Sequence, residues 1–238
     1  MSVYWFITSF TWLGLIIALV IYIFISKIGA DIGVHRYFCH KSFVAKPWAH
    51  KMFLGLSILG GFGSAVHYTA VHRLHHVKAD TPEDPHSPHF KGALNVWLLK
   101  LGDDWTVSLK YVKDLIRDKN HVFLYKNHFK LYLSYILFAV IIAVIFGWQW
   151  LVCIWALPAA LAFHTSSALN VICHLYGYQT HKTRDKSTNN TWLNFITGGS
   201  ALHHNHHAFP NAYSHAGEKW YEFDLWGWLI KHVFMVKE

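Results

Sequence analysis

Residues 72–76 read HRLHH and residues 203–207 read HHNHH, so the pattern His-x-x-His-His occurs twice in one chain. On a helix, side chains at positions i, i+3 and i+4 share a face, which lets each pattern present three imidazoles to one site. Two shorter motifs add similar groups, HRYFCH at 35–40 and NVICH at 170–174. The side chains that these four motifs offer to one site are His35, His40, His72, His75, His76, Asn170, His174, His203, His206 and His207.

Neutral imidazole is the commonest metal ligand in proteins and binds iron, zinc, copper and nickel. The nine histidines exceed the about four to six ligands of one ion, so they predict two ions held side by side. His35 and His40 are about 140° apart on a regular helix, so their convergence requires a helix end or an irregular turn. We expect eight other histidines to be surface or hydrogen-bonded side chains: His50, His86, His89, His121, His128, His181, His215 and His232.

The composition is that of a membrane protein, with 53% hydrophobic and only 14% charged residues. Residues 3–26 contain no charge and reach the roughly 20 residues that cross the hydrocarbon core. A cleaved signal peptide is the alternative, but no basic segment precedes this run and no small-residue cleavage site follows it. Residues 131–169 are interrupted only by FGWQW at 146–150, which predicts two spans joined by a tight turn. The three cysteines predict no disulfide framework.

The basic residues predict the topology. All 21 Lys and Arg lie in 27–130 or 182–237, so the positive-inside rule places both stretches in the cytoplasm and the N-terminus outside. If residues 47–70 crossed the membrane, the first two histidine motifs would lie on opposite sides. We therefore expect this segment to lie in the interface or to re-enter, which leaves three spans.

These features predict one membrane-bound domain over residues 1–238. We expect an all-α membrane protein with about three to four transmembrane helices, capped by a cytoplasmic helical domain that holds a histidine-rich dinuclear metal site.

Five motifs also carry a resemblance to a known family, in order and spacing. They are GVHRYFCHKSF (33–43), VHRLHHVKADTPEDPHSP (71–88), NVICHLYG (170–177), HHNHHAFP (203–210) and EKWYEFDLWGWLI (218–230). Together they resemble the integral-membrane fatty acyl desaturases, in the acyl-CoA (stearoyl-CoA, delta-9) branch. The resemblance implies a protein of the bacterial inner membrane whose active site faces the cytoplasm.

The resemblance also implies the chemistry. Two irons would activate dioxygen and remove two hydrogens from neighbouring carbons of a saturated acyl chain, carried by coenzyme A, acyl carrier protein or a glycerolipid. The double bond would be cis, between the ninth and tenth carbons. Electrons would come from an external donor, such as a ferredoxin or a small haem protein with its reductase, because no donor domain is expected in the chain. Zinc can replace iron in a structure, since imidazole discriminates weakly between them.

By the same resemblance, the ligands divide between the two irons. One iron would be held by His35, His40, His76 and His207, with Asn170 through a water. The other would be held by His72, His75, His174, His203 and His206. Asp80, Asp84 and Asp185 are candidates for orienting the rings. Two positions depart from the family: its usual Gly-Glu-Gly-Trp reads GSAL at 199–202, with Ser200 in place of Glu and Leu202 in place of Trp.

The substrate residues are predicted from their positions. His164, Thr165 and Trp105 are candidates for substrate binding, with Ser166 and Ser167 bordering a bend near Asn170. The closed end of an acyl tunnel would be formed by bulky side chains of the spans, for which the candidates are Trp5, Phe6, Phe10, Trp12, Phe138 and Trp155.

Other functions are less consistent with the residues. A hydroxylase or another oxidative lipid enzyme of the same superfamily would need the same cage. A metal transporter should carry ionisable side chains along a membrane path, but the centres of 3–26 and 131–160 contain none. A zinc hydrolase would be expected to place a carboxylate base near the metal. We expect a membrane and an acyl substrate as partners, and no nucleic acid.

Overall fold

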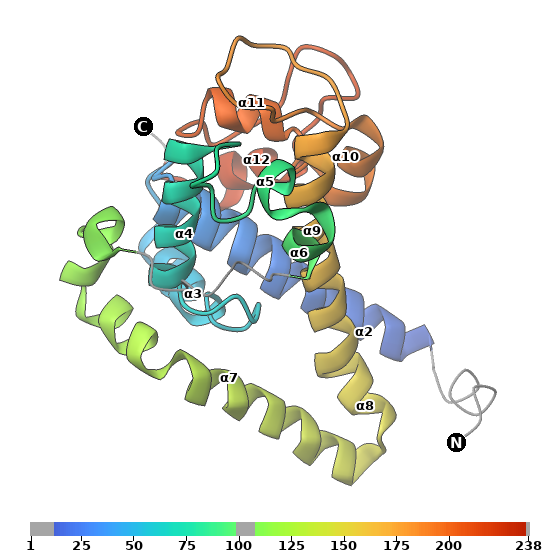
Figure 1. Cartoon of the computed structure of the whole chain (residues 1–238). Coiled ribbons are helices and arrows are strands. Elements are labelled where there is room, and N and C mark those ends of the chain that lie inside the picture. Colours follow the sequence, from blue (N-terminus) through green and yellow to red (C-terminus); the bar gives the residue numbers. More distant parts are fainter. Residues whose placement is uncertain (1–11, 99–107, 237–238) are drawn as a thin grey trace.

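A computed structural model describes residues 12–98 and 108–236 (Figure 1). Within these ranges all the regular structure is helical, and the only β-type pairs are isolated bridges. The α-helices are α2 (Trp12–Tyr22), α3 (Pro47–Leu56), α4 (Ala65–Lys78), α5 (Pro88–Lys91), α6 (Ala93–Trp97), α7 (Lys119–Phe146), α8 (Gln149–Leu151), α9 (Leu157–Leu175), α10 (Thr191–Thr197), α11 (His203–Ala208) and α12 (Leu225–Leu229). The 3₁₀ and π segments are η1 (Ile23–Cys39), η2 (Leu109–Val112), η3 (Leu115–Arg117), η4 (Val152–Ala156) and η5 (Ile230–Phe234).

Three helices are long and apolar enough to cross a membrane: Trp12–Cys39, Lys119–Phe146 and Gln149–Leu175. The all-helical membrane fold and the three spans are therefore as predicted. The first helix differs from the expected run of 3–26, because residues 3–11 lie outside the described part and the helix continues to Cys39. The first histidine motif therefore lies at the end of the same continuous helix as the apolar segment.

The second and third spans form the predicted hairpin. α7 ends at Gly147, whose φ of 111° is unfavourable for other residues, and the next helix begins at Gln149. The hairpin is longer than the apolar stretch 131–169. Its first helix begins earlier, at Lys119, and its second ends later, at Leu175, because both include neighbouring polar residues. α7 starts where Asp118 accepts a hydrogen bond from the Asn120 N–H at 2.7 Å. In Figure 1 the turn of this hairpin lies at the end of the molecule opposite to the short helices α5, α10, α11 and α12.

The segment 47–70 is not one long helix. It divides into α3 and the first part of α4, joined by a turn in which Gly61 and Gly63 have positive φ. Neither helix belongs to the three candidate spans. That the segment lies in the interface or re-enters the membrane stays a prediction.

A buried ion pair fixes the first membrane helix to the C-terminal segment. Arg36 is fully buried and donates two hydrogen bonds to Asp224, at 2.7 and 3.2 Å, and a third to the Tyr213 carbonyl at 2.9 Å. Around it lies an apolar core built from η1, α3, α4 and η5, with Ile32, Phe53 and Ile230 at its centre. The element that carries His35 is thus held rigidly on two sides.

Candidate metal centre

The nine histidines of the motifs form two adjacent groups. The first histidine group consists of His35, His40, His72, His76 and His206. Nε2 of His206 lies 3.1 Å from Nε2 of His35 and 2.9 Å from Nε2 of His76, and Nε2 of His76 lies 3.0 Å from Nε2 of His72. The ring of His40 packs edge-on against that of His206, with centroids 4.6 Å apart.

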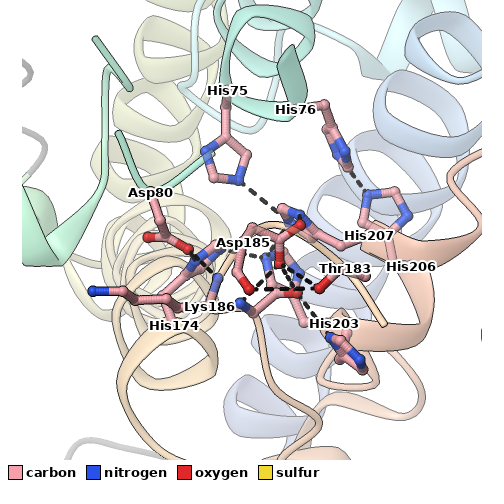
Figure 2. Close-up of polar contacts among 12 residues, drawn as sticks. His75, His76, Asp80, His174, Thr183, Asp185, Lys186, His203, His206 and His207 are labelled. Carbon is pink, nitrogen blue, oxygen red and sulfur yellow. Dashed lines mark hydrogen bonds and ion pairs between the residues drawn. The ribbon is translucent and has the colours of Figure 1, made fainter. Parts of the chain in front are cut away.

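The second histidine group consists of His75, His174, His203 and His207. Nε2 of His207 lies 3.3 Å from Nε2 of His75 and 3.1 Å from Nε2 of His203, which is 3.0 Å from Nε2 of His174 (Figure 2). The groups touch where the rings of His76 and His207 stack, with centroids 4.4 Å apart. Two ions can therefore lie side by side.

The irregular spacing of the first motif is explained by its backbone. η1 is wound with the i→i+5 hydrogen bonds of a π-helix, and the His40 N–H donates to the His35 carbonyl at 3.1 Å. The rings of His35 and His40 therefore meet edge-on, with centroids 4.9 Å apart, as the motif required.

The ligand atoms group differently from the expected division between the two irons, and that division stays a prediction. His72 and His206 belong with His35, and His207 belongs with His75. The reason is helical geometry: the first and last histidines of each triplet are at i and i+4 and nearly overlie, whereas the middle one is rotated away. α4 thus gives His75 to the second group, and α11 gives His206 to the first. Asn170, assigned to the first iron, lies one turn before His174 of the second group.

Carboxylates contact the far side of the ligand rings. Nδ1 of His75 lies 2.9 Å from both oxygens of Asp84, and Nδ1 of His174 lies 2.9 Å from Asp80. Nδ1 of His207 lies 3.4 Å from Asp185 (Figure 2). The three predicted acids therefore do orient rings. A carboxylate that accepts the Nδ1 proton leaves the Nε2 lone pair free to face a metal.

Burial determines the charge of the ligands. Burial, followed by the neighbouring imidazoles, lowers the pKa of six ligand histidines outside the candidate spans well below 6.5; these are His40, His72, His75, His76, His203 and His206. They are therefore neutral, which is the form that binds metals. Burial also acts to raise the pKa of Asp80, but hydrogen bonds from His174, Lys186 and Ser87 outweigh it and lower the pKa to about 2.

The donor set fits metal ions. In each group, ring nitrogens of four histidines lie within 4.8 Å of one another, so potential ligand atoms face each other at close range. Nε2 of His40 is buried and has no hydrogen-bond partner among the described residues. A cation within the first group would give this nitrogen a partner.

Three residues near the ligands were not predicted. Asp31 lies 3.2 Å from Nδ1 of His35, and its position one turn earlier on the helix was the available signal. His86 is buried with its ring stacked on His75, centroids 4.0 Å apart. His215 is buried beside His206, and neither of its ring nitrogens has a partner in the described part of the chain. His86 and His215 were expected to be surface or hydrogen-bonded side chains, and no spacing rule distinguishes them.

Two cavities adjoin the histidines. A smaller cavity of about 70 Å³ is lined by Asp31, His35, Thr165, Ser200 and His215 among others. A larger cavity of about 770 Å³ lies between α4, the 58–63 turn and α7. The two cavities are adjacent, because five side chains line both of them: Phe62, Tyr68, His72, Ser166 and Asn170.

Of the predicted substrate residues that the structure describes, one lines a cavity beside the metal centre and one does not. Thr165 lines the smaller cavity and accepts or donates a hydrogen bond with the Tyr22 hydroxyl at 2.9 Å. His164 lines neither of these two cavities and instead accepts from the Trp97 indole at 3.2 Å. Trp105 lies outside the described residues.

Of the predicted tunnel-end residues, some are exposed on the surface and one contacts a residue that lines the larger cavity. Trp12 and Phe138 are exposed on the outer surface of their helices, whereas the Trp155 indole donates to the hydroxyl of Tyr132, which lines the larger cavity. Trp5, Phe6 and Phe10 lie outside the described residues.

Comparisons with known proteins agree with this site. Delta-9 acyl-lipid desaturase 1 of Arabidopsis thaliana is 28% identical over 231 residues, 96% of this chain and 74% of that protein. The sn-1 stearoyl-lipid 9-desaturase of Synechocystis sp. is 30% identical over 237 residues, 95% of this chain and 71% of that protein. The family described as fatty acid desaturase matches residues 10–234. The chain therefore belongs to the fatty acid desaturase family, as its motifs predicted, and is a membrane oxidoreductase of fatty acyl chains.

Proposed function

We propose that this enzyme introduces a cis double bond between the ninth and tenth carbons of a saturated 16- or 18-carbon acyl chain, using two irons and dioxygen. The observation that carries the proposal is the pair of buried histidine groups beside an apolar cavity, which the ligand His72 lines. Position nine is named for the Arabidopsis and Synechocystis relatives.

The histidine groups would each hold one iron, the first through five imidazoles and the second through four. Bound iron would supply, from dioxygen, the oxidising power that breaks unactivated C–H bonds, which no side-chain base reaches. The reaction consumes one dioxygen, two electrons and two protons, and yields the alkene and two waters. The electrons would come from an external donor, such as a ferredoxin or a small haem protein.

The larger cavity would hold the acyl chain. Its volume is within the about 300–1,000 Å³ of ligand pockets, and each buried methylene contributes about 0.8 kcal/mol. Ile58, Phe62, Val71 and Phe129 provide apolar walls, and the ligand His72 lines the same cavity. A chain lying there would present its methylenes to the metal centre and exclude water from it.

The carrier of the acyl chain is the open part of the proposal. Lipid-linked chains are named for the relatives above, acyl-CoA for a 5-desaturase of Anemone leveillei and an acyl carrier protein for an acetylenase of Moorena producens. Assays of the purified enzyme with all three carriers and a reducing system would distinguish them.

The test is expression of the chain in a bacterial host, with gas chromatography of its lipids and iron analysis of the purified protein. His72→Ala, His75→Ala and His206→Ala should abolish the unsaturated product while the protein still inserts into the membrane. The exposed His232 is the matched control, and His232→Ala should keep full activity. Full desaturation by any of the three ligand variants would refute the proposal, and a hydroxylated chain would favour the hydroxylase alternative.

A further inference from the structure

Asp31 is a carboxylate inside a membrane-length helix. It lies within Trp12–Cys39, and its side chain is only 12% exposed. Ionisable groups in such helices are costly and mark functional sites. The nearby apolar core offers no reason for a charge at this position, so its contacts must provide one.

Three side chains surround the Asp31 carboxylate. Oδ1 lies 3.2 Å from Nδ1 of His35 and accepts from Nε of Arg36 at 3.3 Å. The Ser200 hydroxyl donates to Oδ2 at 2.7 Å. Each oxygen thus has a separate task, because Ser200 holds one of them and the other faces the ring of His35.

These contacts resemble those of the other ligand rings, with one difference of origin. His75, His174 and His207 receive their carboxylates from loop residues, whereas His35 receives its carboxylate from its own helix, with a hydroxyl from residue 200 behind it. Arg36 is directed mainly to Asp224, so it does not require Asp31 to remain paired.

We propose that Asp31, held by Ser200, is a positioning residue that fixes the ring of His35 toward the first histidine group. We further infer that the carboxylate that orients the ring of His35 can come from either position 31 or position 200. A glutamate at 200 would extend into the place of the Asp31 carboxylate, and the smaller cavity, which both residues line, offers room for it. This inference rests on the proposed function in that His35 binds one of the metals.

The experiment titrates metal-free protein in detergent with Fe(II) or Co(II) and counts the ions bound per chain. Asp31→Ala should weaken one of two sites by about 10- to 100-fold, and Asp31→Asn, which keeps one acceptor oxygen and the shape, should lie between. The double variant Asp31→Ala/Ser200→Glu should recover binding to within a few-fold of the wild type. Glu83→Ala, which removes an exposed carboxylate outside the site, should change nothing.

Thermal unfolding of each variant separates a positioning role from a structural one. The inference is overturned if Asp31→Ala binds both ions as the wild type does, or if the double variant is folded yet binds no better than Asp31→Ala. Should Asp31→Ala fail to fold, the comparison of Asp31→Asn with the wild type decides in the same way. Because the titration needs no turnover, an inactive chain whose Asp31 variants lose metal would refute the desaturase proposal and keep this inference.

Discussion

At the scale of single residues, the loop after α4 is folded around its own carboxylates. Asp84 accepts the backbone N–H of Asp80 at 2.9 Å and that of His86 at 3.0 Å while it contacts the ring of His75. Asp80 has a φ of 56°, a conformation that Asp tolerates better than most residues. The short acidic side chains therefore shape the turn and orient two ligands at once.

A first prediction concerns His215, whose two ring nitrogens have no partner in the described structure although its backbone is held by Asp224 and Asn205. Replacing an unpaired buried polar group by an apolar one of similar shape is nearly neutral. His215→Phe should leave the midpoint of thermal unfolding in detergent unchanged or slightly higher. Asn205→Leu, which loses hydrogen bonds to Thr180, Asn189 and His215, should lower it. A large loss with His215→Phe would mean that its nitrogens are satisfied.

The sequence was sufficient to predict which side chains converge on the metal centre. It was insufficient to predict how they divide between the two histidine groups. Spacing shows that three histidines share a helix face, yet a 60–100° difference within that face decides which metal each would reach. Asp80 and Asp84 were predictable because they lie within the second motif, and Asp185 because it lies in the segment between the third and fourth motifs. His86 and His215 were not, because their burial depends on segments packed from elsewhere in the chain.

At the scale of elements, close packing of η1 on α3 positions the first histidine motif. A Cβ at Gly33 would lie 3.0 Å from Phe53 atoms, and one at Gly29 would lie 2.9 Å from Cβ of Leu56. Small residues four apart allow membrane helices to approach closely. The glycines thus let α3 support the helix that presents His35.

A second prediction follows from this packing. Gly33→Ala should lower the free energy of unfolding by about 1–3 kcal/mol, because the fully buried Phe53 has little room to move. Gly55→Ala on the same helix pair is the matched control, since nothing lies near its Cβ position. It should be neutral or stabilise by up to about 1 kcal/mol through helix propensity. Equal effects from both substitutions, measured by thermal unfolding, would contradict the packing argument.

A third prediction concerns Arg73, which clamps α4 to neighbouring elements through Asp114 at 2.8 and 3.0 Å and the Cys39 carbonyl at 2.7 Å. Burial acts to raise the pKa of Asp114, but hydrogen bonds from Arg73 and Lys41 outweigh it and lower the pKa below its ordinary 3.8. The folded pKa is the lower one, so the stabilisation is present at neutral pH and is lost as the pH falls below about 4.

Asp114→Asn should therefore reduce stability by about 1 kcal/mol at pH 7, and this difference from the wild type should shrink in acid. Glu83→Gln, which removes an exposed partner of Lys78, is the control and should show no such trend. Unfolding midpoints measured from pH 7 to pH 3 would show it, and a constant difference across that range would exclude the ion pair as its cause.

Element boundaries were harder to predict than element types. Hydropathy gave the centres of all three spans, but each described helix continues into polar sequence, to Cys39, from Lys119 and to Leu175. Backbone hydrogen bonding continues regardless of polarity until a cap or a glycine stops it. The π winding of η1 was predictable only as an irregularity required by the spacing of His35 and His40.

At the scale of the whole molecule, the position of the metal centre constrains the topology. All four histidine motifs meet at one site, and three spans would place the two basic stretches on one side of the membrane with it. Reporter fusions should place the N-terminus outside and both 27–130 and the C-terminus in the cytoplasm. An even number of spans, or evidence that 47–70 crosses the membrane, would contradict this arrangement.

The last prediction concerns the length of acyl chain that the larger cavity accepts. Tyr132 closes part of this cavity: its hydroxyl would lie 3.2 Å from a Cβ at Gly61 and accepts from the Trp155 indole at 3.1 Å, so the ring bridges α7, η4 and the 58–63 turn. Removing the ring should extend the cavity away from His72.

Tyr132→Ala should therefore accept longer saturated chains, while the distance of the double bond from the carboxyl end stays fixed, because the chain is registered from its head group. Phe138→Ala on the same helix removes an exposed aromatic ring and should leave chain length unchanged. Feeding chains of different length and locating the double bond by mass spectrometry measures both. If the bond instead keeps its distance from the methyl end, the chain is positioned by its tail against Tyr132, and the ring would set the site of desaturation rather than the length of the substrate.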